Sequence, residues 1–296
     1  MPAAGALIRL VRLPSVVTVP GDVLAGAAWG PDPIAAGTTA RVTSSALAYL
    51  GGMALNDWAD REEDARERPG RPIPAGEVAP ETALAVAVGL SLAALALALA
   101  AGGDSDHGRR GPGLTVPLVA TVWAYDLYAK HTATGPWTMA LARTLDVLVG
   151  AGRPRRGALG PAGLIGAHTL LITIVSRREA HGAGRQLAAG ALGGVAITAG
   201  AALALIRRQG FTGRRVDRVL QVGAVSIYAS IMTRAGIGAL RDGDAASAQR
   251  FVGAGVFANM PLQAAMLAAR GRAVTAAATL VAWHVGRRAG RKVAVT

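Results

Sequence analysis

Three aspartates near the start of the chain have the spacing of a ligand set on one helical face. Asp57, Asp60 and Asp64 follow one another at i, i+3 and i+7, so on a helix their side chains point in the same direction. Three carboxylates on one face repel one another unless a positive charge joins them. Oxygen ligands favour a hard cation, and Mg²⁺ commonly combines one or two carboxylates with substrate phosphates. The spacing therefore predicts a Mg²⁺ site for a phosphate-bearing ligand.

Polar residues on either side of the acids extend the predicted site. Asn56 directly precedes the first acid and offers the metal a further oxygen. Arg68 and Arg71 lie in a stiff Arg-Pro-x-Arg-Pro-x-Pro stretch, and guanidinium groups bind phosphate oxygens well. We expect Asn56 and the three aspartates to hold Mg²⁺, and the arginines to bind a diphosphate at the mouth of a membrane helix. The simpler interpretation is a charged loop that is only solvated.

The composition indicates a membrane protein. The 296 residues are 52% hydrophobic and 17% charged, and the charges are clustered, so apolar runs long enough to cross a bilayer lie between them. The chain has no cysteine, which excludes disulfides, thiolate metal sites and cysteine nucleophiles. The net charge of +13 comes almost entirely from arginine. In a membrane protein this charge suits anionic lipid head groups and phosphate-bearing substrates, and no nucleic-acid-binding motif accompanies it.

The apolar segments predict an all-α fold. They lie near residues 14–30, 40–56, 80–101, 114–129, 136–151, 160–176, 187–206, 218–238, 251–269 and 273–288. The last two are short, so we expect a polytopic membrane bundle of about nine transmembrane helices around a central cavity. No extramembrane domain is evident, and residues 1–296 are expected to form a single domain. Gly and Ala throughout the segments allow close helix packing in lipid.

Alternation of these segments across the membrane brings three polar clusters to one face. The second, fourth and sixth segments all end on the side of the N-terminus. Their ends carry residues 56–72, 125–131 and 176–181, which hold most of the polar chemistry of the chain. Scattered charges would not be expected to gather in this way, so the pattern predicts one shared site.

The second cluster closes the fourth segment with Tyr125, Asp126 and Lys130. A lysine at a helix end often only reaches the interface, but beside a carboxylate and Mg²⁺ site Lys130 is a candidate diphosphate ligand. Asp126 is either a further acid of the site or the partner of Lys130 one turn away. Tyr125 either faces a cationic intermediate or belongs to an interfacial aromatic belt.

The third cluster, at the end of the sixth segment, combines Arg177 and Arg178 with Glu179. Guanidinium groups can neutralise diphosphate oxygens directly and so take over part of a metal's role. We expect one or both arginines to bind the diphosphate. The number of Mg²⁺ ions at the site, one or two, is not fixed by the sequence. Glu179 or Asp126 is the candidate to accept a proton from a second substrate.

Ionisable and amide side chains also occur inside the apolar segments, where they are costly and usually functional. Arg143 and Asp146 lie one turn apart in the fifth segment and form either a structural ion pair or part of the site. Asn259 and Gln263 lie one turn apart on a late helix, and we expect them to form interhelical hydrogen bonds. Asp22 either faces the cavity or caps a neighbouring turn.

The first cluster resembles the first aspartate-rich motif of the UbiA superfamily of intramembrane prenyltransferases. The resemblance rests on Asn-Asp-x-x-Asp-x-x-x-Asp from Asn56, followed by Arg-Pro-x-Arg-Pro-Ile-Pro-x-Gly from Arg68. The stretch from Tyr125 is similar to the family's Tyr-x-x-x-Lys-Arg-x-Thr-x-x-Pro, with one more residue before the lysine and His131 in place of arginine. Family members typically have a second aspartate-rich motif, which binds a second Mg²⁺.

The equivalent stretch here holds one carboxylate, Glu179. In this respect the chain resembles a divergent bacterial branch of the family that includes EboC-type proteins.

The resemblance implies Mg²⁺-dependent transfer of an isoprenyl group from a prenyl diphosphate to a small acceptor. The acceptor is expected to be either an aromatic compound or a polyol- or sugar-like one. It also implies an integral protein of the bacterial inner membrane, in contact with its lipids, with the site facing the cytoplasm. Without an external acceptor the same site would serve a terpene cyclase. Two other classes stay open. A transporter or lipid flippase would also suit an intramembrane charged cavity, and the missing second acid pair would suit a membrane scaffold with a decayed site.

Overall fold

The computed structural model describes residues 2–30, 37–101, 113–152, 156–179, 182–208 and 214–290. The first half of the chain forms α1 (Ala4–Leu10), η1 (Leu13–Thr18), α2 (Pro20–Trp29), α3 (Gly37–Ala59), α4 (Arg61–Glu67) and α5 (Pro80–Ala101). The second half forms α6 (Thr115–Ala124), η2 (Tyr125–Ala129), α7 (Gly135–Ala151), α8 (Arg156–Ser176), α9 (Gly184–Arg208), α10 (Arg215–Asp242), α11 (Ala245–Ala268) and α12 (Ala273–Gly290). No strand occurs in these ranges, which confirms the all-α prediction.

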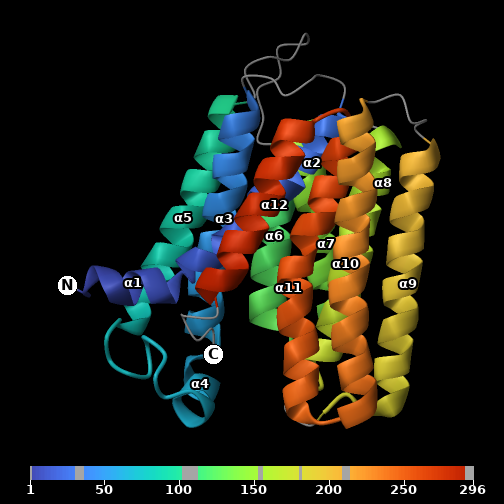
Figure 1. Cartoon of the computed structure of the whole chain (residues 1–296). Coiled ribbons are helices and arrows are strands. Elements are labelled where there is room, and N and C mark those ends of the chain that lie inside the picture. Colours follow the sequence, from blue (N-terminus) through green and yellow to red (C-terminus); the bar gives the residue numbers. More distant parts are fainter. Residues whose placement is uncertain are drawn as a thin grey trace.

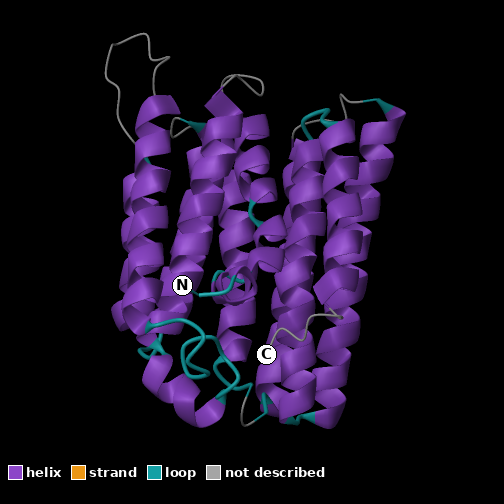
Figure 2. Cartoon of the chain, turned by 90° about the vertical axis from the view of Figure 1, so that its left-hand side faces the viewer, coloured by secondary structure: helices purple, strands orange, loops and turns teal. Residues whose placement is uncertain are grey.

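The predicted apolar segments coincide with these helices. Within the described ranges, five helices have both the length and the apolar composition to cross a membrane: α5, α8, α9, α10 and α11. They run side by side with the remaining long helices as one bundle (Figures 1 and 2). The protein is therefore a polytopic helical membrane bundle, as the sequence predicts.

Two predicted segments are less regular than expected. The segment at 14–30 divides into the 3₁₀-helix η1 and the ten-residue α2, with Pro20 at the first position of α2. The segment at 114–129 ends in η2, a single stretch of π-helix that contains Tyr125 and Asp126. Such π-helical turns often occur at functional sites, and here the turn carries two residues of the predicted site.

Close contact between α2 and α7 depends on glycine. A Cβ atom added to Gly26 would lie 1.7 Å from the Val147 carbonyl oxygen, and one added to Gly150 would lie 2.0 Å from the Val23 carbonyl oxygen. Any larger residue would push the two helices apart, because no real Cβ contact is that short. These small residues join helices in lipid by van der Waals packing.

The topology places the polar clusters at one end of the bundle. Figure 1 shows α4, the connection from α4 to α5 and the turn between α10 and α11 at the lower end. The short helix α1 lies across the bundle direction near that end and buries Ala6 and Leu10 in a cluster with Leu55 of α3 and Ala83 of α5. This packing brings the η1 region next to the end of α3.

Candidate functional site

The structure brings the first and last predicted acids together on one arginine. The Nη1 atom of Arg71 lies 3.2 Å from Asp57 Oδ1 and 2.6 Å from Asp64 Oδ2. Both carboxylates are buried, with 4% and 1% of their surface exposed. Arg68 approaches Asp64 from the solvent side, at 3.5 Å from Oδ1. The Arg-Pro-rich stretch therefore folds back onto the acids that precede it.

Asp60 lies apart from this pair because the helix bends at its position. α3 ends at Ala59 and α4 begins at Arg61, although the Asp60 N–H still donates to the Asn56 carbonyl and the Asp64 N–H to the Asp60 carbonyl. The Asp60 carboxylate turns toward the second cluster, where Lys130 Nζ lies 2.5 Å from its Oδ1. The three acids therefore do not share one helical face as the spacing predicted.

A second group of possible metal ligands surrounds Asp60. One ligand atom each from Asp60, Glu63 and His131 lie within 4.8 Å of one another. Glu63 was not among the residues predicted for the site, because the prediction considered only the three aspartates of this stretch. The half-buried position of both acids and the exposed imidazole of His131 leave this group accessible from the end of the bundle.

The second cluster contacts the first through Asp126. Its buried carboxylate accepts a hydrogen bond from Asn56 Nδ2 at 3.1 Å. Asp126 is therefore in the acid cluster rather than paired with Lys130, whose ion pair is with Asp60. Tyr125, in the same π-helical turn, is half-buried and interacts electrostatically with Asp60 and Arg177.

The third cluster interacts with both of the others. The Arg177 guanidinium donates to the Thr132 carbonyl oxygen in the connection after η2. Burial raises the pKa of Glu179, while the positive charge of Arg68 acts in the opposite direction. Glu179 is thus within electrostatic reach of the first cluster. Arg178 is exposed and lines an outer groove with Ile174 and Leu187, and in the described ranges it has no ion pair with the acids.

Arg12 is a residue of this site that sequence reasoning missed. Its Nη2 atom donates to Asp57 Oδ1 at 2.8 Å and to Asn56 Oδ1 at 3.2 Å. Arg12 has a φ of 47°, the single positive φ among the described non-glycine residues. A left-handed backbone costs about 1–3 kcal/mol for such a residue, and strain of this kind gathers at functional sites. The sequence signal was weak, because an arginine before an apolar run is also common in targeting segments.

The oxygen donors that a hard cation needs occur here in two groups, Asp57 and Asp64 around Arg71, and Asp60 and Glu63 beside His131. Asn56, Asp57, Asp60 and Asp64 offer oxygen atoms, which Mg²⁺ prefers, and the two most buried carboxylates depend on neighbouring cations to offset their burial. Arg12, Arg71 and Lys130 supply that positive charge here.

Deep in the bundle, Arg143 pairs with a different acid from the one expected. Its Nη2 atom lies 2.7 Å from Asp22 Oδ2 on α2, whereas Asp146 accepts a hydrogen bond from Ser45. The predicted ion pair between Arg143 and Asp146 is therefore wrong, because Arg143 forms its ion pair with Asp22. Asp22 also accepts from Gln263 at 2.7 Å and from Asn259 at 3.3 Å, which confirms the interhelical hydrogen bonds expected of those two amides.

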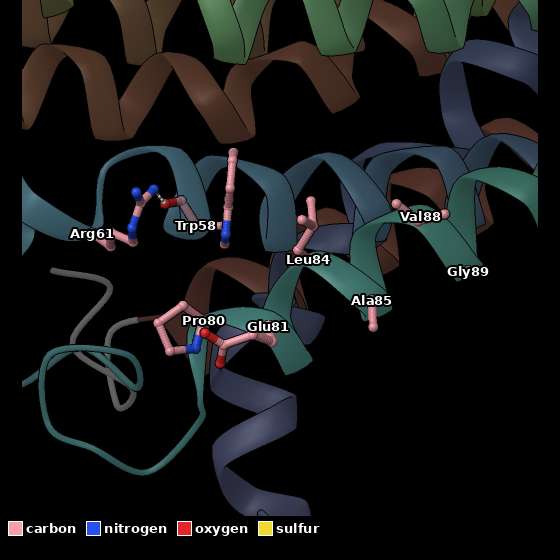
Figure 3. Close-up of a pocket in the computed structure, with 8 residues that line it drawn as sticks. All are labelled: Trp58, Arg61, Pro80, Glu81, Leu84, Ala85, Val88 and Gly89. Atoms are coloured by element: carbon pink, nitrogen blue, oxygen red, sulfur yellow. Dashed lines mark hydrogen bonds between the residues drawn. The ribbon is translucent and has the colours of Figure 1, made fainter.

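An outer groove of about 700 Å³ lies between the end of α3 and the start of α5 (Figure 3). Trp58, Leu84 and Val88 are among the residues that line it, and the Arg61 guanidinium donates to the Trp58 carbonyl oxygen at 2.9 Å. None of the residues predicted for the site lines this groove.

Together, the fold and the site define an integral membrane protein with carboxylates and basic groups gathered at one end of its bundle. A model of the UbiA prenyltransferase family matches residues 15–207. The chain belongs to this family, as the motif from Asn56 onward predicted. Its place in a bacterial EboC-like branch stays a prediction.

Two curated relatives match shorter stretches. Digeranylgeranylglyceryl phosphate synthase of Methanothrix thermoacetophila is 59% identical over 34 residues, which are 12% of this chain and 13% of the relative. The protein of the same name from Methanopyrus kandleri is 40% identical over 65 residues, which are 22% of each. The aligned stretches thus span less than a quarter of either relative.

Solved structures match over nearly the whole chain. A UbiA homolog from Archaeoglobus fulgidus bound to GPP and Mg²⁺ is 15% identical with a TM-score of 0.63, and the match covers 96% of this chain and 99% of the homolog. A structure described for digeranylgeranylglyceryl phosphate synthase in membranes is also 15% identical, with a TM-score of 0.58 over 91% of this chain and 98% of that one. At this identity the matches establish the shared fold.

Proposed function

We propose that this protein transfers an isoprenyl group from a prenyl diphosphate to a small acceptor. The observation that carries the proposal is the convergence of three polar clusters, distant in sequence, on one end of the bundle. Hydrogen bonds and ion pairs join each cluster to the next, from Asp60 to Lys130 and from Thr132 to Arg177. Family membership and the GPP and Mg²⁺ bound by the homolog from Archaeoglobus fulgidus support the same reaction class.

The basic residues of the site have two alternative partners. Arg12, Arg71 and Lys130 form ion pairs with Asp57, Asp64 and Asp60. Mg²⁺ held by Asn56 and these three aspartates would supply the positive charge that stabilises the departing diphosphate. Arg12, Arg71 and Lys130, together with Arg68 and Arg177, are the residues that would bind the phosphate oxygens.

The five basic side chains then stabilise negative charge as it develops on the leaving group. Arg178, which follows Arg177 in the turn after α8, is a further candidate to bind the diphosphate.

Two carboxylates are positioned to accept the acceptor's proton. Asp126 is buried beside Asn56, and Glu179 is half-buried near Arg68. Tyr125, between the two clusters, faces the reacting isoprenoid, where its ring stabilises positive charge. The acceptor is either an aromatic compound or a polyol- or sugar-like one. The apolar helices hold the isoprenoid tail.

We further propose that residues 1–296 form one domain in the bacterial inner membrane, with the acid cluster facing the cytoplasm. Helices beyond the family match support the single domain, since α11 packs against α2 and α8, and α12 packs against η1. Collection of the acids and bases at one end favours a transferase over a transporter, because alternating access needs gates at both ends.

Diphosphate release tests this function. We would incubate the purified protein with geranyl, farnesyl and geranylgeranyl diphosphate, with and without Mg²⁺, and add membrane extract as a source of acceptor. Asp60→Ala is expected to abolish release, while Glu62→Ala, which changes an acid of α4 whose side chain is 87% exposed, is expected to retain it. Release without extract, together with a cyclic hydrocarbon, would identify a cyclase. Equal release by wild type and Asp60→Ala would refute the assigned site.

A further inference from the structure

A small pocket lies at the end of the bundle opposite the acid cluster. It has a volume of about 210 Å³, and it is lined by residues from two places in the chain, Arg214 and Asp217 at the start of α10, and Gly271 to Thr275 at the start of α12. Figure 1 shows both helices beginning at the upper end, away from α4. The volume is below the range of about 300–1,000 Å³ for sites that enclose a whole drug-sized ligand. The pocket therefore fits a head group rather than a complete lipid.

One side of the pocket suits an anion. Ala273, Val274 and Thr275 are the first three residues of the 18-residue helix α12, so their N–H groups have no partner within the helix. The helix dipole adds partial positive charge at the same place. Arg272 and Arg214 add two guanidinium groups, and neither forms an ion pair within the ranges that the structure describes. A phosphate group matches this combination of donors.

The other side of the pocket needs a hydrogen-bond donor. Asp217 is 2% exposed. Its Oδ2 atom accepts a hydrogen bond from the Arg214 N–H at 3.0 Å, whereas its Oδ1 atom is buried without a hydrogen-bond partner. An unpaired buried carboxylate oxygen is costly, and a phosphate cannot satisfy it. A ligand with an ammonium N–H next to its phosphate satisfies both sides.

The surroundings indicate that such a ligand comes from the membrane. Val274, which lines the pocket, is 84% exposed, and Val219 and Val216, which flank Asp217 on α10, are 64% and 49% exposed. These exposed apolar side chains at the starts of α10 and α12 suit contact with acyl chains. A soluble phosphate compound would gain nothing from them.

We propose that this pocket binds the head group of phosphatidylethanolamine from the leaflet opposite the acid cluster. Its phosphate lies against the start of α12 and the two arginines, and its ammonium group donates to Asp217. The site is separate from the proposed transferase site and does not depend on that assignment.

Native mass spectrometry of delipidated protein tests the site. The probes are phosphatidylethanolamine, phosphatidylcholine with the same acyl chains, and soluble phosphoethanolamine. Phosphatidylcholine carries the same charges but no ammonium N–H, so we expect wild type to prefer phosphatidylethanolamine by roughly tenfold. Asp217→Asn retains an oxygen for the Arg214 N–H and should remove the preference. Arg272→Gln, outside the α10 cap, should weaken both lipids.

Arg208→Gln is the matched control, since it removes an exposed arginine at the same end outside the pocket. It is expected to bind both lipids as wild type does. Equal occupancy by the two lipids in wild type would overturn the proposal. So would variants Asp217→Asn and Arg272→Gln that match Arg208→Gln, or displacement of the lipid by an equal concentration of phosphoethanolamine, which would assign the pocket to soluble anions.

Discussion

The Lys130 ammonium and the Asp60 carboxylate form an ion pair, with 2.5 Å between Nζ and Oδ1. Lys130 follows η2 and Asp60 follows α3, so this pair joins two clusters that are seventy positions apart in sequence. Lys130 is 8% exposed and Asp60 is 16% exposed. Such a shielded pair has a stronger interaction than one in open solvent, and it holds a cation next to the proposed diphosphate site.

Replacement of Lys130 by Met should reduce diphosphate release by about 10²–10³-fold, because a charge that stabilises the leaving group is lost. Lys130→Arg should retain part of the activity. Release is measured with saturating prenyl diphosphate and Mg²⁺. Arg208→Gln, which changes an exposed arginine at the end of α9 away from the acid cluster, serves as the control and should resemble wild type. A Lys130→Met enzyme as active as this control would exclude the role of Lys130.

Replacement of Arg71 by Leu should destabilise the protein by about 3–5 kcal/mol, because the buried Asp57 and Asp64 lose their shared partner. Mg²⁺ should restore part of the lost stability, since the cation replaces the guanidinium between the carboxylates. Thermal unfolding in detergent with and without Mg²⁺ measures both effects. Arg66→Leu changes an exposed arginine of α4 and should have little effect in either condition. If Mg²⁺ raised the Tm of neither variant, Asp57 and Asp64 would not be metal ligands.

The fold and most of the site were predictable because their signals are local. Long apolar runs predict helices, and the alternation of those helices placed the clusters at Asp60, Lys130 and Arg177 on one face. The partner of each side chain was not predictable in the same way. Asp57 contacts Arg12, which directly precedes η1, and Arg143 contacts Asp22 of α2. These contacts depend on the relative orientation of helices that are far apart in sequence. The spacing of residues within one helix does not determine that orientation.

The bend at Asp60 was missed for a related reason. The sequence from Asn56 to Asp64 has no proline or glycine, so helical spacing was the natural expectation. Tertiary contacts override it, because Arg71 draws Asp57 and Asp64 together while Lys130 draws Asp60 away.

The ionisation of Glu179 should make stability depend on pH. Burial raises the pKa of this carboxyl, so the folded state favours the protonated form. The stability that this form provides is present at low pH and is lost as pH rises through the folded pKa. Relative to Glu179→Gln, wild type should therefore become less stable as the pH rises above the usual range of a glutamate pKa, by under about 1 kcal/mol because the group is half-exposed.

Chemical or thermal unfolding at several pH values measures this difference. Glu62→Gln, which changes an acid whose side chain is 87% exposed, is the matched control for the substitution itself. A wild-type protein that gained stability over Glu179→Gln on raising the pH would contradict the burial of Glu179.

The absence of cysteine allows the orientation to be measured with single substitutions. Glu62→Cys places a thiol beside the acid cluster, and Arg208→Cys places one at the opposite end. In intact spheroplasts a membrane-impermeant maleimide should label the Arg208→Cys variant, and should label the Glu62→Cys variant only after permeabilisation. The reverse pattern would place the acid cluster outside the cytoplasm, and labelling of both variants in intact cells would contradict a bundle that separates them.

The pair of Asp22 and Arg143 should be the strongest coupling in the interior of the bundle. Asp22 is fully buried, and its carboxylate oxygens are joined to Arg143, Gln263 and Asn259. Arg143→Leu leaves this charge uncompensated and should destabilise the protein by about 3–5 kcal/mol. Adding Asp22→Asn should recover much of the loss, because the neutral amide retains the hydrogen bonds without the charge.

A double-mutant cycle on the free energy of unfolding measures this coupling. The matched control replaces Asp146, the acid one turn from Arg143 on α7, by Asn in the same Arg143→Leu background. Asp146 contacts Ser45 rather than Arg143, so this replacement should recover less stability than Asp22→Asn does. If Asp146→Asn were the better rescue, the intrahelical pair suggested by sequence spacing would be the true one, and the packing of α2 against α7 would have to differ from that described here.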